Sequence, residues 1–339
     1  MTRAIDARAW ARAHRAALDH VLAVVSTAPW SDALVLRGSM AMVAWAGDRA
    51  RPPRDLDWIV LPPAAVPVDP LHPYPYVDGV DSVQDWPEAN GGAAGYELYR
   101  DEGELLDTGG RHPVVPPEGT HWVEDPYDDE RDPSGAVLSL LERRPLTPCG
   151  VQLAPSRYTV DSTWEYGEYD FGPTGGGGVR VRFPWRAAGG LEGEVQLDFA
   201  LDEPMPEAPV FALVPRADEL GPTVVRTASR ELSLAWKLLW LHADSAGDDG
   251  ARGKDLFDAV LLAESPRTRL APKLLHRVFA RAGALDLGHL TEHDVRNWVV
   301  DWRSFRIEHP DVRGDADAWR ARLARAIAPV LAVGEEGTS

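Results

Sequence analysis

Two stretches decide the fold expected for this chain: Leu34-Val35-Leu36-Arg37-Gly38-Ser39 and, further on, Arg54-Asp55-Leu56-Asp57. The first is an apolar strand that ends at a glycine, and a short helix-like run follows it. The second opens another apolar strand with two acids two positions apart. Side chains alternate along a strand, so Asp55 and Asp57 are expected to point to the same side. The pattern predicts a strand–glycine–helix–strand unit that carries two carboxylates.

The chemistry of such a unit is specific. A helix N-terminus that follows a glycine favours anions, and paired carboxylates are the oxygen ligands that divalent metals prefer. In-line displacement at a nucleotide α-phosphate needs charge neutralised on the attacking and leaving oxygens, and carboxylate-bound metals can do this. The arrangement is typical of a nucleotidyltransferase. The alternative is a strand edge with solvated acids, which the preceding strand–Gly-Ser–helix pattern disfavours.

A third carboxylate is expected from Asp198, within the alternating strand Glu194–Ala200. A charge framed by apolar residues on a central strand is costly unless a metal or a partner compensates it. Its expected role is either metal ligand or the base that takes the proton of the nucleophile. An acid on an edge strand is the competing interpretation.

Lysine usage singles out another position. Of 35 basic residues only Lys237, Lys254 and Lys273 are lysines. Lys237 lies in Leu234–Leu239, among residues expected to be buried, and a compact ammonium reaching a phosphate is a role that arginine fills poorly. A lysine that extends along a helix surface to solvent is the alternative. Asp255 begins the next helix, where a capping acid is an equally good interpretation.

Composition limits the class of protein. The chain has 339 residues, 44% hydrophobic and 26% charged, which is ordinary for a globular protein. A single cysteine, Cys149, excludes an internal disulfide. The first thirty residues lack the apolar core of a signal peptide, and no run approaches the roughly 18 apolar residues of a membrane span. We therefore expect a cytoplasmic protein without a membrane partner.

The net charge of −18 disfavours a general nucleic-acid binder. The acidity is unevenly placed, because residues 62–131 hold 16 acidic residues and 3 arginines. Residues 226–330 hold 17 basic and 15 acidic residues. The C-terminal half could therefore face an anionic acceptor, at rims such as Arg226, Arg230 and Arg252.

The pattern along the chain predicts an α+β fold with a mixed β-sheet core and a C-terminal helical bundle. Helical spacing covers 4–25, 39–46 and five segments from 229 onward, whereas strand patterns cover 33–37, 56–61, 157–166, 179–184 and 194–200. The five helical segments are 229–243, 254–262, 270–282, 291–307 and 316–333. We expect a core domain over 1–225, with an irregular acidic insertion at about 62–150, and a helical domain over 226–339.

Taken together, these stretches resemble the AbiEii-type nucleotidyltransferase toxins, which belong to the DNA polymerase β-like nucleotidyltransferase superfamily and are related to MenT-type toxins. The matching segments are Leu34–Ser39 with Arg54–Asp57, Val195–Phe199, Glu231–Leu241 and Gly253–Asp258, in the order of the family. The acidic insertion at 62–131 has no counterpart that we can place.

The resemblance assigns roles to particular residues. It implies that Gly38 and Ser39 hold the triphosphate and that Asp55 and Asp57 bind magnesium. It makes Lys237 and Asp255 the remaining essential residues, with Lys237 also at the nucleotide. Arg37, which stands where the family usually has lysine, joins the expected nucleotide-binding set. Asp198 completes the expected metal ligands.

The expected function is a magnesium-dependent nucleotidyltransferase that moves an NMP group from an NTP to an acceptor hydroxyl and releases pyrophosphate. The resemblance makes a tRNA 3′ end the expected acceptor and implies a toxin of a toxin–antitoxin or phage-defence pair, with a cognate antitoxin as partner. One alternative is an antibiotic nucleotidyltransferase, whose acidic insertion would attract a cationic aminoglycoside. Another is a catalytically degenerate protein that only binds.

Overall fold

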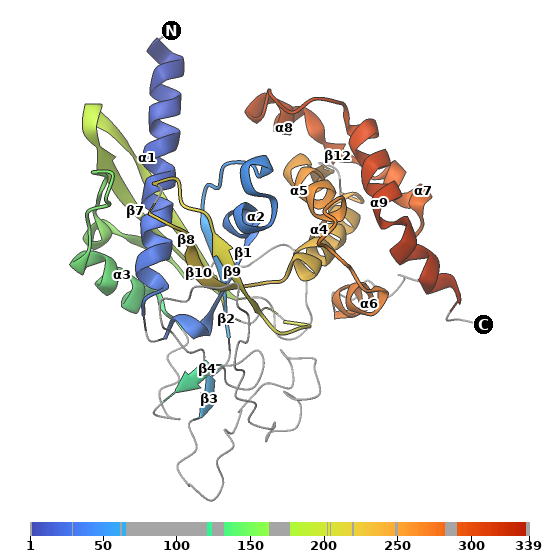
Figure 1. The fold of residues 1–339 in the computed structure, drawn as a ribbon, viewed down its shortest axis with the longest axis horizontal. Helices are drawn as coiled ribbons and strands as arrows, with labels where there is room; N and C mark the ends of the chain where they lie inside the picture. The colour runs from blue at the N-terminus through green and yellow to red at the C-terminus, as the bar shows by residue number, and fades with distance from the viewer. Residues whose placement is uncertain are drawn as a thin grey trace, which may run out of the picture. The chain divides into compact units, whose positions relative to one another are not determined.

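The structure is a computed structural model, and it describes residues 2–28, 30–61, 63–65, 121–123, 132–162, 177–201, 203, 205–218, 220–247, 250–281 and 290–336. The chain forms two compact units. Unit 1 comprises residues 1–47 and 51–228, and unit 2 comprises residues 48–50 and 229–339. Each unit is described by itself below, with the element labels of Figure 1.

Unit 1 is built on a mixed sheet, which confirms the predicted fold class. Its strand order is β5-β7-β8-β2-β1-β10-β9, and β6 also pairs with β7. The strands are β1 (Leu34–Arg37), β2 (Leu56–Val60), β5 (Gln152–Leu153), β6 (Thr159–Asp161), β7 (Gly178–Ala187), β8 (Leu191–Ala200), β9 (Val210–Val214) and β10 (Thr223–Thr227). The apolar residues of the central strands are buried, as fits strands covered on both faces.

The register at the centre of the sheet places charged residues in one row. Strand β1 runs antiparallel to β2, β2 runs parallel to β8, and β8 runs antiparallel to β7. Asp57 of β2 lies opposite Arg37 on one side and opposite Asp198 on the other. Arg180 of β7 lies opposite Asp198. Residues paired in this way present their side chains on the same face of a sheet.

Three α-helices lie among the described residues of unit 1. The long helix α1 (Thr2–Val25) packs on β8 and on α3 (Ser134–Arg143), and α2 (Gly38–Ala46) packs on β1, β2 and β9 (Figure 1). The expected helices at 4–25 and 39–46 are thus confirmed. Helix α3 was not expected, since the whole of 62–150 was predicted to be irregular. Residues 62, 66–120 and 124–131 of that insertion lie outside the described residues. Before residue 132, the described part consists of a backbone pair, β3 (Pro63–Ala65) with β4 (His121–Val123).

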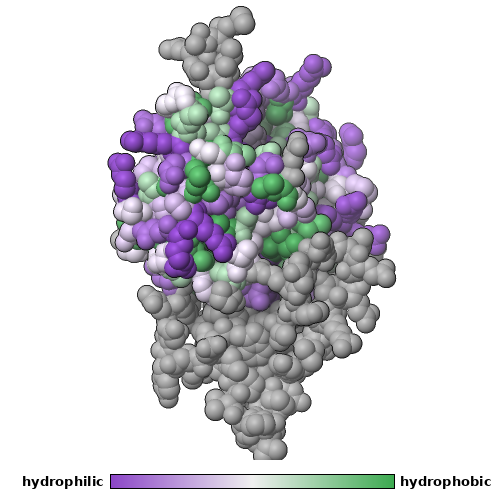
Figure 2. Space-filling view, turned by 60° about the vertical axis from the view of Figure 1, so that its left-hand side comes forward, coloured by the Kyte–Doolittle hydropathy of each residue, from purple (hydrophilic) through white to green (hydrophobic). Residues whose placement is uncertain are grey.

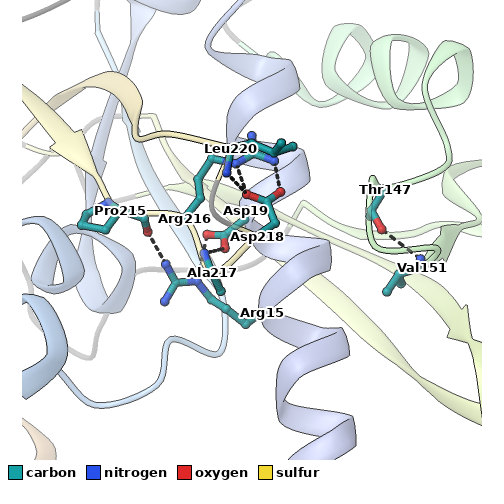
Figure 3. A network of polar contacts seen from close by, with 9 residues as sticks. All are labelled: Arg15, Asp19, Thr147, Val151, Pro215, Arg216, Ala217, Asp218 and Leu220. Carbon is teal, nitrogen blue, oxygen red and sulfur yellow. Dashed lines mark hydrogen bonds and ion pairs between the residues drawn. The ribbon is translucent and has the colours of Figure 1, made fainter.

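A buried acid fastens α1 to the chain that follows β9 (Figure 3). Asp19 accepts hydrogen bonds from Arg15 Nε and from the backbone N–H of Ala217, both at 2.8 Å. Arg15 also donates to the carbonyl oxygen of Pro215. Burial raises the pKa of Asp19, and the neighbouring Arg15 opposes that shift. These contacts tie α1 to the segment of unit 1 that follows β9.

Unit 2 is helical, as predicted. Its helices are α4 (Arg230–Asp244), α5 (Gly253–Ala263), α6 (Pro272–Arg281), α7 (Glu292–Asn297), α8 (Trp302–Glu308) and α9 (Ala316–Glu336). The hydroxyl of Ser229 caps α4 by accepting from the N–H of Leu232. An aromatic cluster of Phe257, Trp302, Phe305 and Trp319 packs between α5, α8 and α9.

The prediction of one helix over 291–307 is wrong, because α7 and α8 are separate. Residues Val300–Asp301 form strand β12, which pairs with β11 (Ala251–Arg252). The carboxylate of Asp301 then caps α8 by accepting from the N–H of Ser304. At the start of α7, Thr291 and Asp294 form a capping box. The pairing of β12 with β11 interrupts the helix, although the apolar residues of 291–307 recur at helical spacing.

The described surface is mixed in character. Figure 2 shows hydrophilic and hydrophobic residues interspersed on its visible face. Cys149 is a free, exposed thiol. No helix among the described residues is long and apolar enough to cross a membrane.

Candidate functional site

Three carboxylates converge in unit 1. Asp55 immediately precedes β2, Asp57 lies within it, and Asp198 lies on the neighbouring strand β8. One oxygen from each lies within 4.8 Å of the others. Asp198 is buried, whereas Asp55 and Asp57 are half-buried. Because β2 and β8 are parallel and Asp57 is in register with Asp198, two strands far apart in sequence bring these groups together.

The turn between β1 and α2 is shaped around Asp57. Gly38 has φ +67°, a conformation that side chains with a Cβ rarely adopt. A Cβ at this position would lie 2.0 Å from Oδ2 of Asp57. The absence of a side chain therefore lets the Asp57 carboxylate lie directly beside the N-terminus of α2. Next along the chain, the buried hydroxyl of Ser39 donates to Oδ1 of Asp55 at 2.9 Å.

Asp198 is held by two side chains. Arg180 donates to both of its oxygens, from Nε to Oδ1 at 2.7 Å and from Nη2 to Oδ2 at 2.8 Å. Gln196 Nε2 also donates to Oδ2, at 2.9 Å. The hydrogen bond to Asp198 raises the pKa of Arg180, and the charges of Asp57 and Asp55 add to the effect. The guanidinium thus lies in the electrostatic field of all three acids.

Arg37 is buried at the end of β1. Its Nη1 pairs with the carboxylate of Glu203, which is also buried. Burial raises the pKa of Glu203, and the charge of Arg37 opposes that shift. The expected role of Arg37 in nucleotide binding stays a prediction, and the ion pair with Glu203 is a contact that the sequence did not indicate.

A histidine supports the segment before Asp55. His14 of α1 lies with Nε2 2.9 Å from the carbonyl oxygen of Arg54, and Nε1 of Trp185 donates to its Nδ1 at 3.3 Å. Since Nδ1 accepts, Nε2 carries the proton and donates to Arg54. Trp10 stacks on the ring. Burial lowers the pKa of His14, which favours the neutral ring that this geometry requires.

In unit 2, Lys237 lies among acids. Its Nζ is 2.7 Å from Oδ1 of Asp255 and 3.2 Å from Oδ2 of Asp258, and all three side chains are almost fully buried. The ammonium also lies over the ring of Trp240. Lys237 therefore does not extend to solvent from the helix surface. Its expected role at the nucleotide, and that of Asp255, stay predictions.

The expected site residues thus form two groups. Asp55, Asp57 and Asp198 come together beside Gly38 and Ser39 in unit 1, and Lys237 pairs with Asp255 in unit 2. Sequence reasoning missed Arg180, Gln196 and His14. The signal for Arg180 was present, since Arg180 and Asp198 lie equally far from Gly189 in a Gly189-Gly190 turn that sets the register of the β7–β8 hairpin.

A mixed sheet that presents three converging carboxylates beside a glycine-led helix N-terminus defines a nucleotidyltransferase. The family model described as nucleotidyl transferase AbiEii toxin, type IV TA system, matches residues 153–328, half of the chain. The chain therefore belongs to the AbiEii family of nucleotidyltransferase toxins, and it is a nucleotidyltransferase. The matched region contains Asp198, Lys237 and Asp255, whereas Asp55 and Asp57 precede it.

A solved structure has a similar fold. The chain resembles MenT4, a nucleotidyltransferase toxin from Mycobacterium tuberculosis H37Rv, with a TM-score of 0.51 and 18% sequence identity. The similarity covers 98% of this chain and 90% of that protein. At 18% identity this comparison supports a similar fold and nothing further. No curated protein matches the sequence.

Proposed function

We propose that this protein transfers an NMP group from an NTP to an acceptor hydroxyl, with release of pyrophosphate, and depends on Mg²⁺ held by Asp55, Asp57 and Asp198. The observation that carries the proposal is the approach of one oxygen from each acid to within 4.8 Å of the others. Three carboxylates this close repel one another unless cations compensate them.

The chemistry of these ligands fits magnesium. All three are hard oxygen donors, which Mg²⁺ prefers to nitrogen or sulfur, and it is commonly held by one or two carboxylates with substrate phosphates completing its shell. When bound, the cation would neutralise charge on the attacking and leaving oxygens of the displacement.

The residues of the chain have distinct proposed roles. Gly38 keeps the N-terminus of α2 open to the triphosphate, because any larger residue would meet Asp57. Ser39 orients Asp55 through its hydroxyl. Asp198 serves as ligand or as the acceptor of the proton from the attacking hydroxyl. We also assign Lys237 and Asp255 to the essential set, as the resemblance to the family implies.

A tRNA 3′ end is the proposed acceptor, and a toxin–antitoxin or phage-defence pair is the proposed setting. The family description, which names a toxin of a type IV system, supports the setting and an antitoxin partner. The tRNA acceptor rests on the resemblance to AbiEii-type toxins. The aminoglycoside alternative depended on the acidic stretch at 62–131, most of which lies outside the described residues, and no structural observation favours it.

The test is transfer of label from each α-labelled NTP to total RNA in the presence of Mg²⁺. Wild type should label RNA, and oxidation of the RNA 3′ diol with periodate should abolish labelling. Asp57→Asn should lose transfer while keeping the wild-type melting temperature within a few degrees. Asp48→Asn, at an exposed acid, is the matched control and should remain active.

Two outcomes would contradict the proposal. Transfer that persists in Asp57→Asn would remove the metal assignment. Labelling of aminoglycosides but never of RNA would leave the chemistry intact and replace the acceptor.

A further inference from the structure

Arg180 engages the third acid of the cluster more completely than any other described contact. Its two donors reach both oxygens of Asp198, and the guanidinium is about one quarter exposed while the carboxylate is buried. Bidentate pairs of this kind are among the strongest hydrogen bonds in proteins and have a fixed geometry. Gln196 also donates to Oδ2, so among the described residues Oδ2 accepts two hydrogen bonds and Oδ1 accepts one. Oδ1 therefore keeps a lone pair for a further ligand.

The position of Arg180 matters as much as its bonds. It comes from β7, the strand next to β8, and the register places it in the same row as Asp198 and Asp57. The charges of Asp57 and Asp55 also act on its guanidinium. One fixed positive charge therefore already compensates part of the charge of three acids.

We propose that Arg180 is the resident counter-cation of the three-carboxylate cluster: it holds Asp198 before a divalent cation arrives and weakens the binding of that cation. The inference rests on the proposed metal site and names a residue that regulates its loading. Arg180 is a positioning residue, since it acts on the reaction through Asp198.

A consequence concerns the order of loading. A divalent cation that enters alone meets the repulsion of Arg180, whereas a cation that enters with a triphosphate brings compensating negative charge. The free protein should therefore bind the metal weakly, and NTP should strengthen that binding. By linkage, the metal should strengthen NTP binding by the same factor.

The experiment measures Mn²⁺ binding to the full chain by calorimetry and by the paramagnetic resonance signal of free Mn²⁺, without acceptor. Arg180→Met should bind Mn²⁺ about tenfold more tightly than wild type, because a unit charge close to the site is removed. The factor by which a non-hydrolysable NTP strengthens Mn²⁺ binding should fall in the same variant. An affinity that is unchanged or lower in Arg180→Met would overturn the proposal.

Arg182 provides the matched control. It lies two residues along the same strand, and its Nε donates to Gln196 rather than to a carboxylate. Arg182→Met should leave Mn²⁺ affinity within about twofold of wild type, since its charge lies farther from the cluster. Equal tightening by both substitutions would mean that only the overall charge of the strand matters, and Arg180 would lose its assigned role.

A second variant covers the case in which Arg180→Met does not fold. Arg180→Gln keeps a hydrogen-bond donor for Asp198 but removes the charge, and it should also tighten Mn²⁺ binding. Asp57→Asn separates the two proposals. If Asp57→Asn binds Mn²⁺ like wild type, the metal site itself is wrong; if it loses Mn²⁺ while both Arg180 variants match wild type, only the role of Arg180 fails.

Discussion

Gly38 and Asp57 show how a missing side chain determines the geometry of this site. The Asp57 carboxylate fills the space that a Cβ on Gly38 would occupy, at a backbone conformation with positive φ. The two constraints have the same consequence: any other residue here strains the turn and displaces the acid.

We therefore expect Gly38→Ala to reduce the free energy of unfolding by about 1–3 kcal/mol and to weaken Mn²⁺ binding by displacing Asp57. Urea denaturation and Mn²⁺ titration measure the two effects. Gly189→Ala is the control, because Gly189 also has positive φ but would meet nothing within 4 Å. It should cost about 1 kcal/mol and leave Mn²⁺ binding unchanged. Normal binding in Gly38→Ala would show that Asp57 does not need this contact.

For single residues, the sequence indicated which side chains form the candidate site but not which partners hold them. The three acids could be found because alternation along two strands and a glycine before a helix are local patterns. Glu203 could not be found as the partner of Arg37, because nothing local links β1 to the chain after β8. Likewise, His14 meets Arg54 only through the packing of α1.

Among the elements, α4 and α5 are joined by the ion group of Lys237 with Asp255 and Asp258. Removing one partner of a buried ion pair leaves an uncompensated charge, which is far more costly than replacing the whole pair.

Lys237→Met should accordingly lower the free energy of unfolding by about 3–5 kcal/mol, as measured by urea denaturation. Lys273→Met, at an exposed position of α6, should change it by less than about 0.5 kcal/mol. If Lys237→Met proves as stable as wild type but inactive, the lysine serves the reaction and not the packing of α4 on α5.

The start of α7 gives a pH-dependent test. Hydrogen bonds from Thr291 lower the pKa of Asp294. A carboxyl group with a lowered pKa stabilises the fold above its unfolded pKa of about 3.9 and loses that contribution as the pH falls through the folded value. Asp294→Ala should therefore melt below wild type at neutral pH, and the difference should shrink below about pH 4. A difference that is constant over this range would indicate lost packing instead.

Element boundaries were predicted well where the pattern was long and local. Helices α1, α4 and α5 follow their apolar spacing closely. The break between α7 and α8 was missed because it depends on β12 pairing with β11, almost fifty residues earlier in the chain. Helix α3 was missed because its ten residues lie next to a stretch rich in Pro, Gly and Asp.

For the whole molecule, we infer that the two compact units are the two domains expected from the sequence. The boundary between residues 228 and 229 falls close to the expected one. If the units unfold separately, calorimetry should resolve two transitions. Mn²⁺ should raise the midpoint temperature of the transition of unit 1, which contains Asp55, Asp57 and Asp198. Lys237→Met should lower the midpoint temperature of the transition of unit 2. A single transition that responds to both changes would count against two independent domains.

The imidazole of His14 can hold Arg54 only as one tautomer, which the indole of Trp185 selects. His14 and Arg54 both precede residues 153–328, the region that the family model matches. A fragment trimmed to residues 153–328 would retain Asp198, Lys237 and Asp255, yet it would lose the first two acids together with the imidazole that steadies them. Such a fragment should be inert, however well its remaining helices fold.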